Sequence, residues 1–163
     1  QNFIPCIANK QYIFYKIMTG FSKQKPPFWY WIFAVIGLAW NLLGVNQYLQ
    51  QAFKTEYLKE MYPDPTILEM VYNTPNWVMA AFAVSVFFGL LGTILLLARK
   101  KFSKILLLIS FIAVLVQMTY QIFLSGSIEY YGPLGLILPV TVILISFALV
   151  RLARKGIKHR WLN

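Results

Sequence analysis

The side chains in this sequence that could do chemistry are neutral amides, hydroxyls and aromatic rings set inside long apolar runs. Asn41, Ser85 and Gln117 lie at a common level, roughly 18 to 21 Å along their runs from the basic ends, at a helical rise of 1.5 Å per residue. Amides and hydroxyls at one level can hydrogen-bond an uncharged solute, and aromatic rings can lie against the face of a sugar ring. The candidate substrate-binding residues are Trp40, Asn41, Ser85, Gln117, Tyr120 and Gln121.

Packing between helices is an alternative explanation for the same polar residues, and the sequence leaves both open. On a helical projection of about 100° per residue, they share faces with small residues, which let helices approach closely. Hydrogen bonds between helices in a membrane contribute roughly 0.6–2 kcal/mol each. The three faces are Ala34, Gly37, Asn41, Gly44 and Tyr48; Ala81, Ser85, Gly89 and Gly92; and Ser110, Gln117, Tyr120 and Gln121, with Thr141 at a comparable level in a fourth run.

Four uncharged runs must position these residues. A helix needs about 20 apolar residues to cross a bilayer, and the hydrophobic fraction of 59% with a mean hydropathy of +0.61 is too high for a soluble fold of this size. We therefore predict an all-α integral membrane protein, a four-helix transmembrane bundle in one domain over 28–153. The predicted spans are 28–49, 77–98, 105–124 and 133–153.

The distribution of charge predicts the orientation. The first 27 residues, the turn at 99–104 and the chain from 151 onward contain four, four and five Lys or Arg residues, whereas the opposite side has only Lys54 and Lys59. All five acidic residues also lie on that opposite side. Because basic segments stay in the cytoplasm, both termini should be cytoplasmic. The net charge of +10 then reflects topology, and no nucleic-acid partner is expected.

The segments around the spans have recognisable signals. Residues 1–27 form a cytoplasmic tail, in which 1–17 are either a loose tail or sequence upstream of a start at Met18, and 154–163 form a basic cytoplasmic tail. In the loop, apolar residues at helical spacing predict a helix near 50–62 that extends the first span, with Phe53, Tyr57 and Met61 packed on the bundle or at the lipid headgroups. Pro63 should end it, and Asp64-Pro65 should start a second helix over 65–73. Pro139 should kink the fourth span mildly.

Several function classes are disfavoured by composition. A single cysteine, Cys6, gives no internal disulfide, and a single histidine, His159, gives no histidine-held metal or haem. No charged residue lies deep within a span, which argues against proton or ion coupling. Nucleophile–base pairs and paired carboxylates within the spans are missing as well, so we expect neither enzyme activity nor a cofactor.

Four stretches give the chain a family resemblance: P-P-F-W-Y-W-I-F-A-V-I-G-L-A-W-N-L-L-G-V at 26–45, Y-N-T-P-N-W-V-M-A-A-F-A-V at 72–84, V-Q-M-T-Y at 116–120 and Y-G-P-L-G-L-I-L-P at 131–139. Over residues 26–163 the sequence resembles small four-span bacterial inner-membrane proteins that are often labelled "sugar transporter". The resemblance implies the four-span fold, a multi-pass location in the bacterial inner membrane and a transport role. It assigns no site residue.

Two functions remain as hypotheses. The first is a small facilitative transporter of a neutral polar solute such as a sugar, which four helices would support only as a homo-oligomer. The second is a non-catalytic accessory or scaffold protein that contacts another membrane protein. In both, the lipid bilayer is the surrounding partner.

Overall fold

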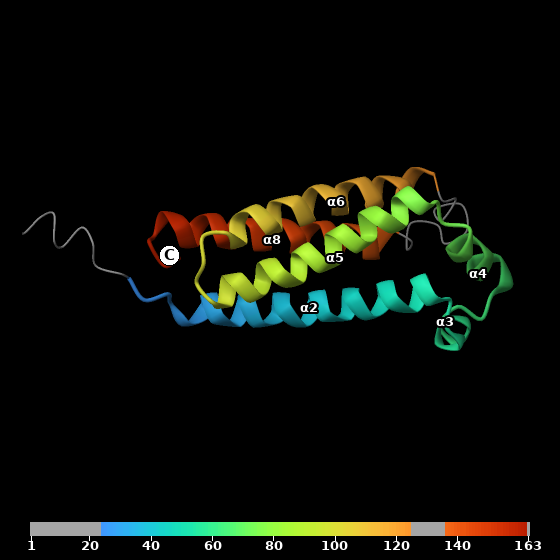
Figure 1. Cartoon of the computed structure of the whole chain (residues 1–163), viewed down its shortest axis with the longest axis horizontal. Helices are drawn as coiled ribbons and strands as arrows, with labels where there is room; N and C mark the ends of the chain where they lie inside the picture. Colours follow the sequence, from blue (N-terminus) through green and yellow to red (C-terminus); the bar gives the residue numbers. More distant parts are fainter. Residues whose placement is uncertain (1–23, 125–135, 163) are drawn as a thin grey trace, which may run out of the picture.

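The computed structural model describes residues 24–124 and 136–162, and the described chain is helical with no strand. Four helices are long and apolar enough to cross a membrane, as the sequence predicted. They are α2 (Phe28–Phe53), α5 (Asn76–Leu97), α6 (Ser103–Phe123) and α8 (Ile137–Lys158). Two short helices, α3 (Glu56–Met61) and α4 (Pro65–Tyr72), lie between α2 and α5 (Figure 1).

Two helices run more than two residues beyond the predicted spans, and the first does so within the extension that the sequence predicted. Helix α2 continues past residue 49 to Phe53, and α8 continues past residue 153 to Lys158. The turn expected between the third and fourth spans, and the start of the fourth span at 133, lie outside the described residues. The kink expected at Pro139 was placed for a helix that begins at 133. Pro139 is instead the third residue of α8, where an N–H would have no intrahelical acceptor, so no kink is required there.

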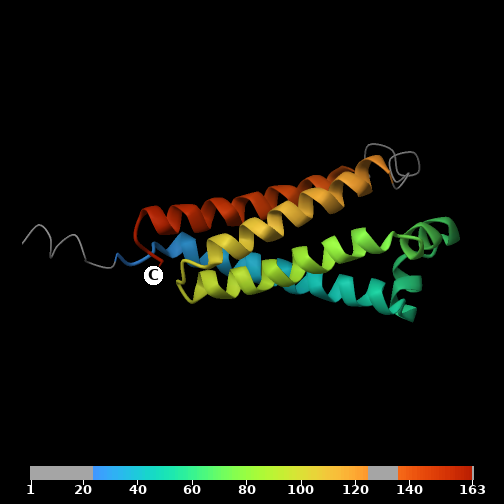
Figure 2. The same cartoon turned by 45° about the horizontal axis from the view of Figure 1, so that its top comes forward.

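The four long helices pack against one another in chain order, and the most extensive interface is between α5 and α6. Helix α5 packs along α2 on one side and along α6 on the other, and α6 packs along α8. Figure 2 shows the α6–α8 pair diverging from the α2–α5 pair toward the end that carries α3 and α4. We call that end the loop end. The opposite end, with the α5–α6 turn and the C-terminal residues, is the basic end.

The basic end is closed by aromatic packing. The buried Tyr30 hydroxyl donates a hydrogen bond to the Leu96 carbonyl at 2.6 Å, which ties α2 to the last turn of α5. The Tyr30 ring packs edge-on against Trp161 at 5.7 Å, and Trp161 is buried after the chain turns back from α8. Arg99 Nε donates to the Trp161 carbonyl at 2.8 Å. The turn, the tail and α2 are therefore joined at this end.

At the loop end, the predicted start of α4 is confirmed and the predicted continuous helix over 50–62 is not. The Asp64 carboxylate accepts a hydrogen bond from the Thr66 amide at 2.8 Å, so α4 begins at the predicted cap. The continuous helix expected over 50–62 is interrupted, because Lys54 takes a left-handed conformation with φ of 49° and α3 starts only at Glu56.

The side chains expected to pack on the bundle from this segment separate into two groups. Phe53 and Tyr57 are 76% and 51% exposed, so they do not pack on the bundle, and their expected position at the lipid headgroups stays a prediction. The break at Lys54 turns α3 away from the axis of α2, and Leu58 becomes the buried residue of α3 instead. Met61 does reach the bundle, where it lines the cavity described next.

Candidate functional site: a cavity between the long helices

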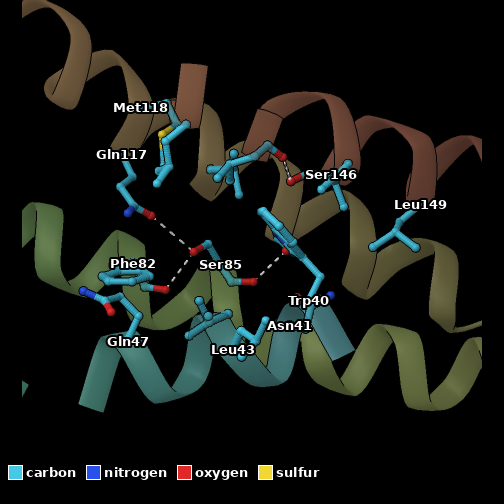
Figure 3. Close-up of a pocket in the computed structure, with 18 of the residues that line it drawn as sticks. Trp40, Asn41, Leu43, Gln47, Phe82, Ser85, Gln117, Met118, Ser146 and Leu149 are labelled. Atoms are coloured by element: carbon cyan, nitrogen blue, oxygen red, sulfur yellow. Dashed lines mark hydrogen bonds between the residues drawn. The ribbon is translucent and has the colours of Figure 1, made fainter. Parts of the chain in front are cut away.

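A cavity of about 380 Å³ lies between the four long helices on the loop-end side of their closest contacts. Its volume is within the range of small-molecule sites, roughly 300–1,000 Å³. Residues of α2, α5, α6 and α8 line it (Figure 3). Met61 and Tyr62 reach it from the loop end. No charged side chain is among the described residues that line it. The cavity therefore suits a neutral ligand.

One wall carries hydroxyl and amide groups from α5 and α6. The Ser85 hydroxyl donates to the Phe82 carbonyl at 2.8 Å and lies 3.3 Å from Gln117 Oε1. The Ser110 hydroxyl donates to the Ser85 carbonyl at 2.6 Å. These bonds, drawn in Figure 3, link the two helices across the cavity wall. The serine hydroxyls are thus already committed to protein acceptors.

Asn41 brings α2 to the same wall. Its Nδ2 donates to the Gly37 carbonyl one turn earlier at 2.8 Å, which holds the side chain along its own helix. Its Oδ1 then lies against Gly89 of α5, so closely that a β-carbon at position 89 would collide with it. A side chain at 89 would have to displace this amide, so glycine permits the close approach of α2 to α5.

The opposite wall is apolar and comes mainly from α8. Its side chains recur at helical spacing, and the one polar residue among them, Ser146, donates its hydroxyl to the Val142 carbonyl at 2.6 Å. Trp40 of α2 extends toward this wall (Figure 3). At the basic end the cavity stops where Leu149 packs against Gly37. The α8 residues in the lining are Leu138, Val142, Ile145, Ser146 and Leu149.

Four of the six candidate residues lie in the cavity wall: Trp40, Asn41, Ser85 and Gln117. Tyr120 and Gln121 do not line it, and their assignment to the same site is corrected here. The Tyr120 ring packs edge-on against Trp77 at 5.5 Å, and Gln121 is exposed in the last turn of α6. Tyr120 and Gln121 lie on the same helical face as Gln117. They are nearer the loop end, beyond Met118, which is the last α6 residue in the cavity lining.

The polar residue of α8 is also different from the one expected. Thr141 donates its hydroxyl to the Ile137 carbonyl at 2.7 Å and does not line the cavity. Ser146 lines it instead, because the inward face of α8 contains 138, 142, 145 and 149. Depth alone selected Thr141, and because the run is apolar on all sides, its periodicity does not indicate which face of the helix turns inward.

Sequence reasoning also left Gln47 and Ser110 out of the candidate set, although both line the cavity. Their spacing from other cavity residues could have identified them from the sequence. Trp40, Gly44 and Gln47 follow the i, i+4, i+7 pattern of one helix face, and Ser110 and Gln117 are two turns apart.

The described residues contain no group of three or more histidine, cysteine, aspartate or glutamate side chains able to hold a metal ion. The site is instead a neutral cavity with hydrogen-bonding groups on one side and hydrocarbon on the other. Comparison with family models, curated proteins and solved structures finds no match for this chain.

Proposed function

We propose that this protein is a facilitative carrier for a small neutral solute, which binds in the cavity beside Asn41, Ser85 and Gln117. The observation that carries the proposal is a cavity of about 380 Å³ between the membrane-crossing helices, with amide groups and no charged side chain among the described residues of its wall. A structural layer alone needs no cavity, because packed helices exclude such a volume. A sugar, as expected from the sequence, is one member of this solute class.

The one-sided closure of the bundle supports a carrier with two alternating states. Leu149 packs into the space above Gly37, and Tyr30 binds Leu96 further toward the basic end. A solute in the cavity is therefore separated from the basic end by packed side chains. Release on that side requires α8 to move away from α2, and the small contact between α2 and α8, beside the extensive α5–α6 interface, makes this the least constrained motion.

The proposal includes an orientation and an assembly. Thirteen of the fifteen Lys and Arg residues belong to segments at the basic end or to the N-terminal tail that precedes α2. We therefore place the basic end on the cytoplasmic side of a bacterial inner membrane. Four helices bury little of their apolar surface. A homo-oligomer would complete the enclosure of the cavity between α2 and α8.

Counterflow in proteoliposomes tests the proposal. Purified protein is reconstituted, loaded with one unlabelled neutral solute at a time, and assayed for uptake of the same labelled solute. Gln117→Leu and Asn41→Leu each remove a cavity amide, and we expect flux to be lost while each variant elutes as a folded protein in detergent. Thr119→Val is the matched control, because Thr119 is exposed on α6 and bonds only to its own helix at Leu115.

Equal flux in wild-type and protein-free vesicles across the panel would reject the carrier. The accessory or scaffold role would then be the better account, and co-purification from native membranes would identify the partner. Flux that persists in both amide variants would show that transport does not use this cavity.

A further inference from the structure

We infer that the ligand of this cavity is a neutral amphiphile, with one small polar head and an apolar body, that reaches it from the bilayer between α2 and α8. The inference rests on the proposed function and narrows its solute class. It follows from three observations: which polar groups in the wall remain available, what covers the rest of the wall, and where the wall is incomplete.

Most polar groups of the cavity are already used within the protein. The hydroxyls of Ser85, Ser110 and Ser146 each donate to a backbone carbonyl, and Asn41 Nδ2 does the same. Three donors in the wall have no hydrogen bond among the described residues: the side-chain amide of Gln47, Nε2 of Gln117 and the indole Nε1 of Trp40.

This count disfavours a sugar. A sugar carries a hydroxyl on nearly every carbon, and each one that leaves water without a partner is penalised. A ligand with a single hydroxyl or carbonyl head needs only one of these donors, such as Gln117 Nε2. The cavity wall therefore suits a ligand with one polar group better than a sugar with many hydroxyls.

The remainder of the wall is hydrocarbon. It is formed by Leu, Val, Ile, Met and aromatic side chains, most densely on the α8 side opposite the amides. An apolar cavity of this size does not hold ordered water well, because water needs two to four polar partners. An alkyl or ring body would fill the space and contact these side chains. The apolar residues of the lining are Trp40, Leu43, Met61, Phe82, Val86, Leu107, Val114, Met118, Leu138, Val142, Ile145 and Leu149.

The wall is incomplete between α2 and α8. The two helices meet at the basic end, where Leu149 covers Gly37, and they separate toward the loop end (Figure 2). Above that contact, Leu43 of α2 and Leu138 of α8 line the cavity and are still 66% and 65% exposed. Along the described chain, the cavity is thus open to the side between two helices that are long and apolar enough to cross a membrane. A lipid-soluble molecule can enter there without crossing water.

Photolabelling with a diazirine derivative of dodecanol tests the assignment. The full-length protein is reconstituted in phosphatidylcholine vesicles, irradiated with increasing probe, and digested for mass spectrometry. We expect saturable labelling of peptides that line the cavity on α6 and α8, which unlabelled dodecanol prevents and glucose does not. Labelling that only rises in proportion to probe, or that glucose prevents, would overturn the inference.

A matched pair of tryptophan substitutions locates the labelling. Ser146→Trp fills the cavity from α8 and should abolish the saturable labelling. Leu144→Trp adds the same side chain on the face of α8 that is turned away, where Leu144 is 60% exposed, and should preserve it. If Ser146→Trp fails to fold, Val142→Phe makes a smaller change in the same wall. Saturable labelling that survives in the cavity-filling variants would also overturn the inference.

The labelling and counterflow results separate the two proposals. Saturable, cavity-dependent labelling without flux of any solute would reject the carrier and keep the ligand class. Sugar flux that depends on Gln117, without saturable labelling, would keep the carrier and reject the amphiphile.

Discussion

The side-chain oxygen of Asn41 on α2 lies directly against the backbone of Gly89 on α5, in the position that a β-carbon at 89 would occupy. Ser110 Oγ lies 3.0 Å from the same point, so α2 and α6 both approach α5 through this one glycine. Gly89 thereby holds together the polar wall of the cavity.

Gly89→Ala should accordingly destabilise the bundle by about 1–3 kcal/mol, the usual effect of adding a methyl group to a packed interface. Unfolding in mixed micelles with increasing dodecyl sulfate measures the change. Asn41→Ala removes the atom that the new methyl meets, so the double variant should lose less stability than the two single variants summed. Strict additivity in that cycle would contradict the close approach.

Tyr30→Phe tests the closure of the basic end. The Tyr30 hydroxyl is buried and bonded to the Leu96 carbonyl, so its removal should reduce stability by about 0.5–1.5 kcal/mol in the same unfolding assay. Tyr57→Phe removes the same atom from an exposed ring on α3 and should change nothing measurable. Similar losses in both variants would show that Tyr30 makes no special contribution.

Asp64→Ala should release the start of α4. Loss of the carboxylate that accepts from the Thr66 amide is expected to weaken the helix by about 1 kcal/mol. Hydrogen exchange of peptides covering 65–72 should become faster, while peptides of α5 should be unchanged. Asp64→Asn keeps an acceptor oxygen and should retain most of the protection. Slow exchange in Asp64→Ala would mean that packing alone maintains α4.

The orientation can be tested with single cysteines in a Cys6→Ala background. Glu60→Cys on α3 should react with a membrane-impermeant maleimide added to intact cells, because the loop end is proposed to face outward. Lys101→Cys, in the exposed basic turn, should react only after the cells are permeabilised. The reverse pattern would invert the topology derived from the basic segments.

The four-span fold could be predicted from sequence because uncharged runs of this length have few alternatives. Asp64-Pro65 likewise predicted the start of α4, since both residues favour the same helix terminus. The break at Lys54 could not be foreseen. A lysine in the left-handed conformation is disfavoured intrinsically, and it forms here because the chain must turn between α2 and α3.

The candidate site was predicted in part. Asn41, Ser85 and Gln117 were found because polar residues within a span face the bundle to avoid lipid. Tyr120 and Thr141 were misplaced because depth along a span does not specify rotation about its axis. The cavity itself had no sequence signal, since it arises from the divergence of α8 from α2, and divergence depends on how all four helices pack.

Protection of a cysteine at position 47 is the most direct test of a ligand in the cavity. In the Cys6→Ala background, Gln47→Cys lies in the wall and Asn46→Cys is its exposed neighbour on the same helix. The account predicts that dodecanol slows alkylation by N-ethylmaleimide at position 47 and leaves the rate at position 46 unchanged. Equal slowing at both positions, or at neither, would contradict it.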